Sequence, residues 1–454
     1  MKNLAQDSTR PLLDRFRCTD DLPGFELNGQ LSHDSGYFRF GPNITCYGQC
    51  SSGLPAKRLT DPLHDARGHV SIDGPAVQLP FDFAQVVDNL RYERYLINSL
   101  EEYRAINVLR SMYYFVRPFM PPSVRRSLQK LYFRDWDKAP FPTWPVDHTI
   151  ENILEQLLVL SMKSRNIQRI PFIWFWPNGA SSCTMVTHDV ETRAGMDFCG
   201  QVMDLNDSFA IKTSFQLVPE KRYAIPWQLL DCIRKRGFEI NIHDLNHDGR
   251  LFRNRKEFLH RAERINDYGR QFGALGFRSA VMYRNVEWYD ALDFSYDMSI
   301  PNVAHLDPQR GGCCSVFPFF VGKILELPVT TTQDYTLFHI FNDYSIRLWR
   351  EQVSLIKRRH GLISFIIHPD YIIDGAARSV YTELLQYLSE MRSHGDTWIA
   401  LPREVAAWWR LRSELNLVKT EGAWRIDGEG KERAVIAYAE VVDDRLTYGF
   451  APRF

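Results

Sequence analysis

Short apolar runs alternate with longer segments of helical periodicity between residues 170 and 405. Seven runs have the length of buried β-strands: Phe172–Phe175, Thr184–Thr187, Phe238–Ile242, Phe277–Met282, Ile324–Thr330, Leu362–Ile367 and Trp398–Leu401. Apolar residues recur at helical spacing in the segments Trp227–Arg236, Asn254–Phe272, Asn342–Arg359 and Ala377–His394. This alternation predicts an α/β fold on a mostly parallel sheet, and seven strands favour a distorted (β/α)7 barrel over an open sheet.

The segments on either side of this region have other patterns. A first region, 1–90, is rich in Gly, Pro, Ser and Asp with short apolar runs, which predicts irregular β-structure. In a second region, 91–169, helical spacing from Leu96 to Tyr113 predicts a long helix, and a proline-rich linker precedes another helix near Thr149–Ser164. After the barrel region 170–405, residues 406–454 contain the end of a helix and three short strands. They predict a small C-terminal antiparallel β appendage.

The composition restricts the class of protein. The chain has 454 residues, 44% of them apolar, and 55 basic residues balance 55 acidic ones, so nothing favours a nucleic-acid-binding function. There is no apolar run of membrane-spanning length, and residues 1–8 lack the apolar core of an export signal. We therefore expect a cytoplasmic protein with reduced cysteines, and we interpret Cys46 and Cys50 as plain thiols rather than half of a zinc site.

A helix expected from Ser123 onward is both basic and amphipathic. Its apolar residues are Val124, Leu128, Leu131 and Tyr132. Its basic residues are Arg125, Arg126 and Lys130, and Arg134 follows shortly after. Such a helix either packs on the protein with a solvated basic face or lies on an anionic membrane surface. We favour the packed helix, and peripheral membrane contact stays open.

Polar side chains with the chemistry of a hydrolytic site follow several expected strands. Asp189 and Glu191 come at the end of one apolar run, and His243 and His247 come at the end of another. One carboxylate and two neutral imidazoles are a common ligand set for a divalent metal with an open position. The second carboxylate is then left over as a base. His368 ends a further run and Asp297 lies at another strand end, whereas Arg278 is near the start of its strand. Each residue alone is more often structural, but several at successive strand ends suggest one active face.

The order of these residues resembles that of the polysaccharide deacetylase family, also called the NodB homology domain or carbohydrate esterase family four. Five short motifs carry the resemblance over roughly residues 170–405: Thr187-His188-Asp189-Val190-Glu191, His243 with His247, Phe277-Arg278-Ser279, Asp297-Met298-Ser299 and Ile366-Ile367-His368-Pro369. The chain departs from the family pattern at Val190, where the family usually has the Asp that binds metal. In an Asp-x-Glu arrangement Glu191 would take that role, and the choice between Asp189 and Glu191 stays open. The third motif also lacks its usual proline.

The resemblance implies a distorted (β/α)7 barrel of the polysaccharide deacetylase type, and it implies a reaction and a role for each motif residue. The reaction would be metal-dependent hydrolysis of an N-acetyl group on an amino sugar, in a polysaccharide or its intracellular precursor. Glu191, His243 and His247 would bind the metal, expected to be zinc, with cobalt, nickel or manganese as alternatives. The remaining roles follow in order: Asp189 as base, His368 as acid, Arg278 orienting Asp189, Asp297 orienting His368, and Tyr296 and Tyr371 contacting the sugar.

Two other classes of function remain open. One is a metal-independent hydrolase of a cyclic amide on the same fold, against which the pair His243 and His247 argues. The other is a non-catalytic carbohydrate-binding or scaffold protein, against which the acid–base pair Asp189 and His368 argues. An N-acetylated carbohydrate is the expected partner, and the sequence does not indicate an oligomeric state.

Overall fold

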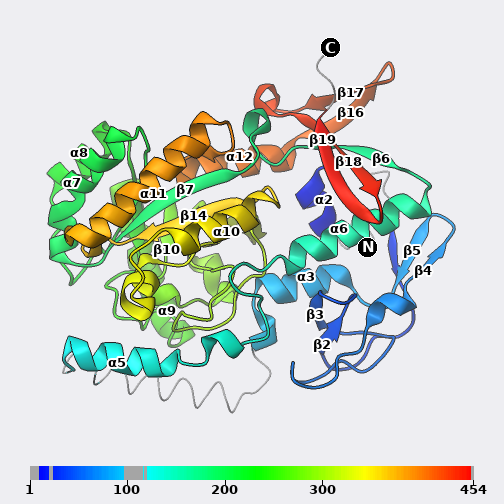
Figure 1. The fold of residues 1–454 in the computed structure, drawn as a ribbon, viewed down its shortest axis with the longest axis horizontal. Coiled ribbons are helices and arrows are strands. Elements are labelled where there is room, and N and C mark those ends of the chain that lie inside the picture. The colour runs from blue at the N-terminus through cyan, green and yellow to red at the C-terminus, as the bar shows by residue number, and fades with distance from the viewer. Residues whose placement is uncertain (1–9, 20–23, 97–115, 117–119, 451–454) are drawn as a thin grey trace.

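A curled, mostly parallel β-sheet with helices packed around it forms the centre of the molecule (Figure 1). The computed structural model describes residues 10–19, 24–96, 116 and 120–450. The helix expected from Leu96 to Tyr113 lies almost wholly outside these residues. None of the helices in the described part of the chain is long and apolar enough to cross a membrane.

The central sheet has the strand order β12-β13-β11-β10-β9-β8-β7-β14, and β15 also pairs with β7. Its strands are β7 (Cys183–Val190), β8 (Ser214–Leu217), β9 (Glu239–His243), β10 (Gly276–Arg278), β11 (Tyr296–Asp297), β12 (Phe319–Val321), β13 (Ile324–Glu326), β14 (Leu362–Ile367) and β15 (Trp398–Ile399). All pairs are parallel except β12 with β13. The predicted α/β class is therefore confirmed, as a half-barrel; the count of seven strand–helix units and the division into four regions stay predictions.

Side chains rather than backbone ladders join the two ends of the curled sheet. Thr330 Oγ1 donates to the carbonyl of Leu362 at 2.8 Å, and Thr331 Oγ1 donates to the carbonyl of Ser364 at 2.8 Å. The backbone N–H of Ser364 donates back to Thr330 Oγ1 at 3.0 Å. The segment after β13 is thereby held against β14, so that the residues following both strands come close together.

Helices that follow the strands cover the sheet: α7 (Arg193–Ser208), α8 (Trp227–Lys235), α9 (Arg255–Phe272), α10 (Arg347–Lys357), α11 (Gly375–Ser393) and α12 (Pro402–Glu414). Their ends follow capping chemistry. The Asn254 side chain accepts from the backbone N–H of Glu257 to begin α9, and Gly273 ends that helix with φ of 57°. The sequence thus specifies these helices locally, while their buried faces are set by the sheet.

The N-terminal region packs against the sheet through a continuous apolar core. It comprises α2 (Arg10–Phe16), β1 (Phe25–Leu27), β2 (Gly36–Arg39), β3 (Thr45–Gly48), β4 (Ser71–Asp73), β5 (Ala76–Leu79), α3 (Phe83–Arg91), α5 (Pro122–Tyr132) and α6 (Thr149–Ser164). β1 pairs with β5 and β5 with β4, whereas β2 and β3 form a separate hairpin. The expected β-structure of this region is therefore present, as two small sheets.

Three expectations about strands need correction. The run expected at Phe172–Phe175 belongs to β6 (Arg169–Ile173), which pairs antiparallel with β18 (Ile436–Val442) outside the curled sheet. The strand expected at Phe277–Met282 ends already at Arg278, because Val281 has φ of 59° and a short 3₁₀ turn follows. The tail, expected to have three short strands, forms four in its described residues. β16 (Asn416–Thr420) and β17 (Ala423–Asp427) make a hairpin, and β19 (Arg445–Phe450) extends the sheet of β18 and β6.

Candidate active site

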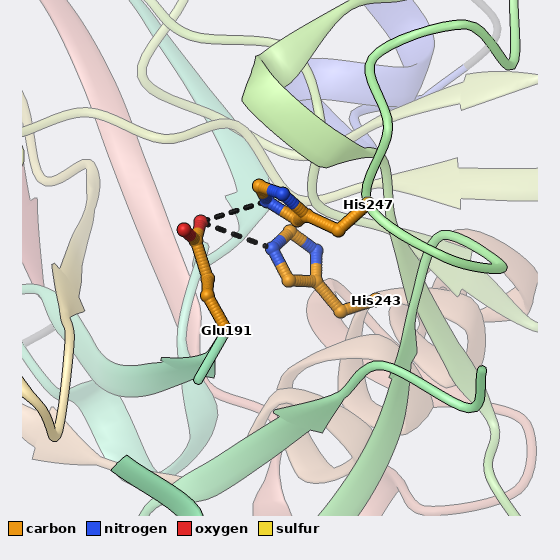
Figure 2. Close-up of side chains that lie close together, drawn as sticks. All are labelled: Glu191, His243 and His247. Atoms are coloured by element: carbon orange, nitrogen blue, oxygen red, sulfur yellow. Dashed lines mark ion pairs between the residues drawn. The ribbon is translucent and has the colours of Figure 1, made fainter. Parts of the chain in front are cut away.

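Three side chains meet where β7 and β9 end. Glu191 follows β7 directly, His243 is the last residue of β9, and His247 lies in the loop beyond. Figure 2 shows the Glu191 carboxylate facing both imidazoles; its Oε1 lies 2.8 Å from His247 Nε2 and 3.6 Å from His243 Nε2. The structure thus brings together the three residues that the sequence offered as metal ligands, with their ligand atoms within 4.8 Å of one another.

The loop after β9 holds His247 in an uncommon backbone conformation. Asp244 has φ of 56° and His247 has φ of 53°, in the left-handed region that residues with a Cβ adopt at a cost. These turns bring the His247 ring back beside that of His243, with ring centroids 4.7 Å apart. The four-residue spacing therefore places both imidazoles together through a folded loop rather than through one face of a helix.

The nitrogen atoms of this cluster suit a divalent metal. Nε2 of His243 and Nε2 of His247 are buried, and neither has a hydrogen-bond partner of acceptable geometry. His243 Nδ1 lies 3.2 Å from the carbonyl of Arg278, so a proton on Nδ1 leaves the Nε2 lone pair directed at the cluster. Burial alone would raise the pKa of Glu191, but His247, His243 and His368 hold it well below its usual value. An ionised carboxylate facing two imidazole nitrogens is a donor set of the zinc type.

The Nδ1 atom of His247 lies beside an arginine side chain rather than beside a backbone carbonyl. The Nη2 atom of Arg222 donates to the carbonyl of His247 at 2.6 Å and lies 3.1 Å from His247 Nδ1. In the tautomer that binds metal through Nε2, Nδ1 carries the proton. Because arginine only donates, the 3.1 Å contact is a hydrogen bond when Nδ1 is unprotonated and the His247 proton is on Nε2; metal binding through Nε2 would move that proton to Nδ1 and leave Arg222 bonded to the carbonyl oxygen alone.

Asp189, the second carboxylate, is paired with a buried arginine. Its Oδ1 accepts from Arg278 Nη1 at 2.6 Å, while its Oδ2 lies 3.7 Å from His243 Nε2. Arg278, the last residue of β10, also donates to Thr187 Oγ1 and to the carbonyl of Met298. Burial by itself would raise the pKa of Asp189, but Arg278, His243 and His368 hold it below its usual value. Asp189 is therefore ionised at neutral pH, and one of its oxygens faces the histidines.

His368 approaches the same cluster from β14. Its Nε2 lies 3.4 Å from Glu191 Oε1, and its Nδ1 lies 2.7 Å from Asp334 Oδ1. The other oxygen of Asp334 accepts from the backbone N–H of His368 at 2.6 Å. Burial would lower the pKa of His368, but the carboxylates of Asp334 and Glu191 raise it well above its usual value. His368 therefore carries a proton on the atom that faces the cluster.

The partner of His368 is Asp334, not Asp297 as the resemblance implied. Asp297 is fully buried and accepts from the hydroxyl and the backbone N–H of Ser299. It also lies beside Glu326, and burial raises the pKa of both carboxyls. Sequence reasoning missed Asp334, although its position just after the run Ile324–Thr330 was the same signal that selected the other residues.

The two tyrosines expected to contact a sugar lie in different places. Tyr296 is fully buried, its hydroxyl donates to Asn241 Oδ1 at 2.9 Å and to Glu239, the first residue of β9, and its ring fills the space where a Cβ on Gly276 would stand. It therefore points toward the amino ends of the strands, and the interpretation of Tyr296 as a substrate contact is wrong. Tyr371 is partly exposed, and its ring centroid lies 4.6 Å from that of His368.

Comparisons with known proteins give distant likenesses in structure alone. No family model matches the sequence, and no curated protein matches it significantly. A candidate polysaccharide deacetylase from Mycobacterium smegmatis is 17% identical, with a TM-score of 0.43 over 55% of this chain and 97% of that one. Puue allantoinase is 13% identical, with a TM-score of 0.41 over 52% and 92%. A candidate polysaccharide deacetylase involved in O-antigen biosynthesis, from Bordetella bronchiseptica, is 16% identical, with a TM-score of 0.31 over 51% and 84%. Likeness of this extent does not define an activity, so the function has to be argued from the side chains.

Proposed function

We propose that the protein is a metal-dependent hydrolase that removes the N-acetyl group of an amino sugar. One observation carries the proposal: two carboxylates and three imidazoles converge on a single buried centre. Glu191 Oε1 lies within 4 Å of the Nε2 atoms of His243, His247 and His368, and Asp189 Oδ2 lies 3.7 Å from His243 Nε2. The choice of an N-acetylated sugar as substrate rests on the resemblance of the five motifs.

Glu191, His243 and His247 would hold the metal. Bound there, a divalent ion lowers the pKa of a water molecule and stabilises negative charge on the acetyl carbonyl oxygen. Zinc fits two imidazoles and one carboxylate, and cobalt, nickel and manganese accept the same donors. Glu191 is preferred to Asp189 as the carboxylate ligand because Arg278 already occupies one oxygen of Asp189.

Asp189 would act as the base. It accepts a proton from the water molecule while the oxygen of that water forms a bond to the acetyl carbon. Arg278 keeps Asp189 ionised and fixes its orientation, because the guanidinium is itself held by Thr187 and Met298. Arg278 is therefore a positioning residue.

His368 would act as the acid. Its Nε2 proton passes to the amide nitrogen as the bond from carbon to nitrogen breaks, giving acetate and a free amine. Without that proton the nitrogen would have to leave as an amide anion, which is a very poor leaving group, so this transfer decides whether the intermediate goes forward. Asp334 holds His368 in its protonated form and in place, and Tyr371 lies where a sugar ring could stack.

Acetate release in the presence and absence of metal tests the proposal. We expect acetate from N-acetylated amino-sugar oligomers, loss of that activity after dialysis against a chelator, and recovery on adding zinc or cobalt. An unchanged melting temperature after moderate chelation shows that loss of activity is not loss of fold. Activity that survives complete removal of metal would favour a metal-free hydrolase, and sugar binding without any acetate release would favour a binding protein.

A further inference from the structure

Helix α5 contacts the rest of the protein through polar groups. Gln129 Oε1 accepts a hydrogen bond from the Tyr335 hydroxyl, and the Tyr132 hydroxyl donates to the carbonyl of Pro308 at 3.3 Å. Arg310 donates to the carbonyl of Tyr132 at 3.2 Å. Arg125, one turn before Gln129, is partly buried on the same stripe of the helix. Hydrogen bonds thus tie α5 to the protein, and Phe133, which ends the helix, is buried.

The apolar stripe of α5 faces outward. Val124, Leu128 and Leu131 recur at the spacing of one helix face, and they are 44%, 42% and 61% exposed. A helix that packs on a soluble core has the opposite arrangement, with apolar residues inside and polar ones outside. The helix does pack on the protein with exposed basic residues, as the sequence favoured, but it packs through polar side chains rather than through its apolar stripe.

The charge of α5 indicates what covers this stripe. The helix sequence contains Arg125, Arg126 and Lys130 and no acidic residue. Lys130 is exposed, and Arg134 follows the helix with its side chain 71% exposed and its Nε 3.8 Å from Asp135 Oδ2. A short apolar stripe flanked by basic side chains complements a bilayer surface with anionic lipids, where the stripe meets acyl chains and the cations meet phosphates.

We propose that α5 is a docking helix for an anionic membrane surface. Val124, Leu128 and Leu131 insert among the lipids, and Lys130 lies against their phosphates. Figure 1 shows α5 along one edge of the molecule, away from the sheets at the two chain ends. The helix is tied to the candidate active site, because Tyr335, which holds Gln129, directly follows Asp334. As far as the proposed function holds, an acetylated sugar attached to a lipid would meet the site from that surface.

Vesicle binding of the full-length protein tests this proposal without any assay of hydrolysis. We expect cosedimentation with vesicles of phosphatidylcholine and phosphatidylglycerol, and little with phosphatidylcholine alone. Leu128→Glu/Leu131→Glu should weaken binding by roughly a hundredfold, since each inserted leucine contributes at least about tenfold. Lys130→Glu/Arg134→Glu should weaken it by at least about fivefold per residue and reduce its sensitivity to salt.

Matched controls lie elsewhere on the surface. Leu54→Glu/Ile72→Glu changes two exposed apolar residues, and Lys235→Glu/Lys256→Glu changes two exposed lysines, so both variants should bind vesicles like wild type. Equal loss in controls and α5 variants would overturn the proposal. Absence of binding to anionic vesicles would also overturn it. A lower melting temperature of the Leu128→Glu/Leu131→Glu variant would then show that the chain itself covers the stripe. A changed sedimentation mass of that variant would show that a second copy covers it.

Discussion

Asp189→Asn should lower kcat for acetate release by about 10²–10⁴-fold while the protein keeps its bound metal. Asparagine has nearly the same shape but accepts no proton at neutral pH, so the contribution of a positioned base is lost. The metal content should not change, because the three proposed ligands Glu191, His243 and His247 are unchanged. Acetate release and metal content, measured on the same preparation, separate the two effects.

Asp297→Asn is the matched control for this experiment. Asp297 is equally buried and also ends a strand, but it hydrogen-bonds Ser299 rather than any residue of the cluster. We expect a far smaller change in kcat than for Asp189→Asn. If the two variants lost activity equally with unchanged melting temperatures, Asp189 would not be the base.

His368→Ala should show a loss that depends on the leaving group. With an N-acetylated sugar, kcat/KM should fall by about 10²–10⁴-fold, because the nitrogen would then have to leave as an amide anion. With 4-nitrophenyl acetate, whose leaving group needs no proton, the fall should stay within about tenfold. Steady-state kinetics on the two substrates measure the difference.

Asp334→Asn is tested on the same two substrates, because Asp334 hydrogen-bonds Nδ1 of His368. The amide can still accept from the backbone N–H of His368, but it carries no charge to favour the protonated ring. We expect a smaller loss than for His368→Ala, again confined mainly to the amide substrate. A uniform loss on both substrates in both variants would assign His368 to the architecture of the site rather than to proton transfer.

The sequence located the strands that are buried along their whole length. The run Leu362–Ile367 coincides with β14, β7 contains the run Thr184–Thr187, and β9 covers the run Phe238–Ile242 except for Phe238. The sequence did not reveal β8, because Ser214 and Gln216 interrupt its apolar residues; in the structure Gln216 Nε2 donates to Ser214 Oγ at 3.1 Å. Nor does an apolar run specify its neighbour: Phe172 lies on β6, which pairs with β18 near the end of the chain.

Local motifs located most of the candidate site, since a residue that follows a buried parallel strand must lie at the same edge of the sheet. Glu191, His243 and His247 needed only this rule. The choice between Asp297 and Asp334 did not follow from it, because both carboxylates come after strands. It depends on Thr330 and Thr331, which hold the segment before Asp334 against β14 and so bring that residue to His368. Likewise, the pattern of α5 gave its two faces but not which one faces the protein.

The measurement that tests the central claim most directly is the metal content of purified wild-type protein beside His243→Ala/His247→Ala, by plasma mass spectrometry after growth with zinc. The account predicts close to one divalent ion per chain in the wild type, none in the variant, and acetate release only from the wild type. It is contradicted if the wild type binds no metal even after incubation with zinc, or if the variant retains the same stoichiometry, because Glu191 then shares no metal with the two histidines.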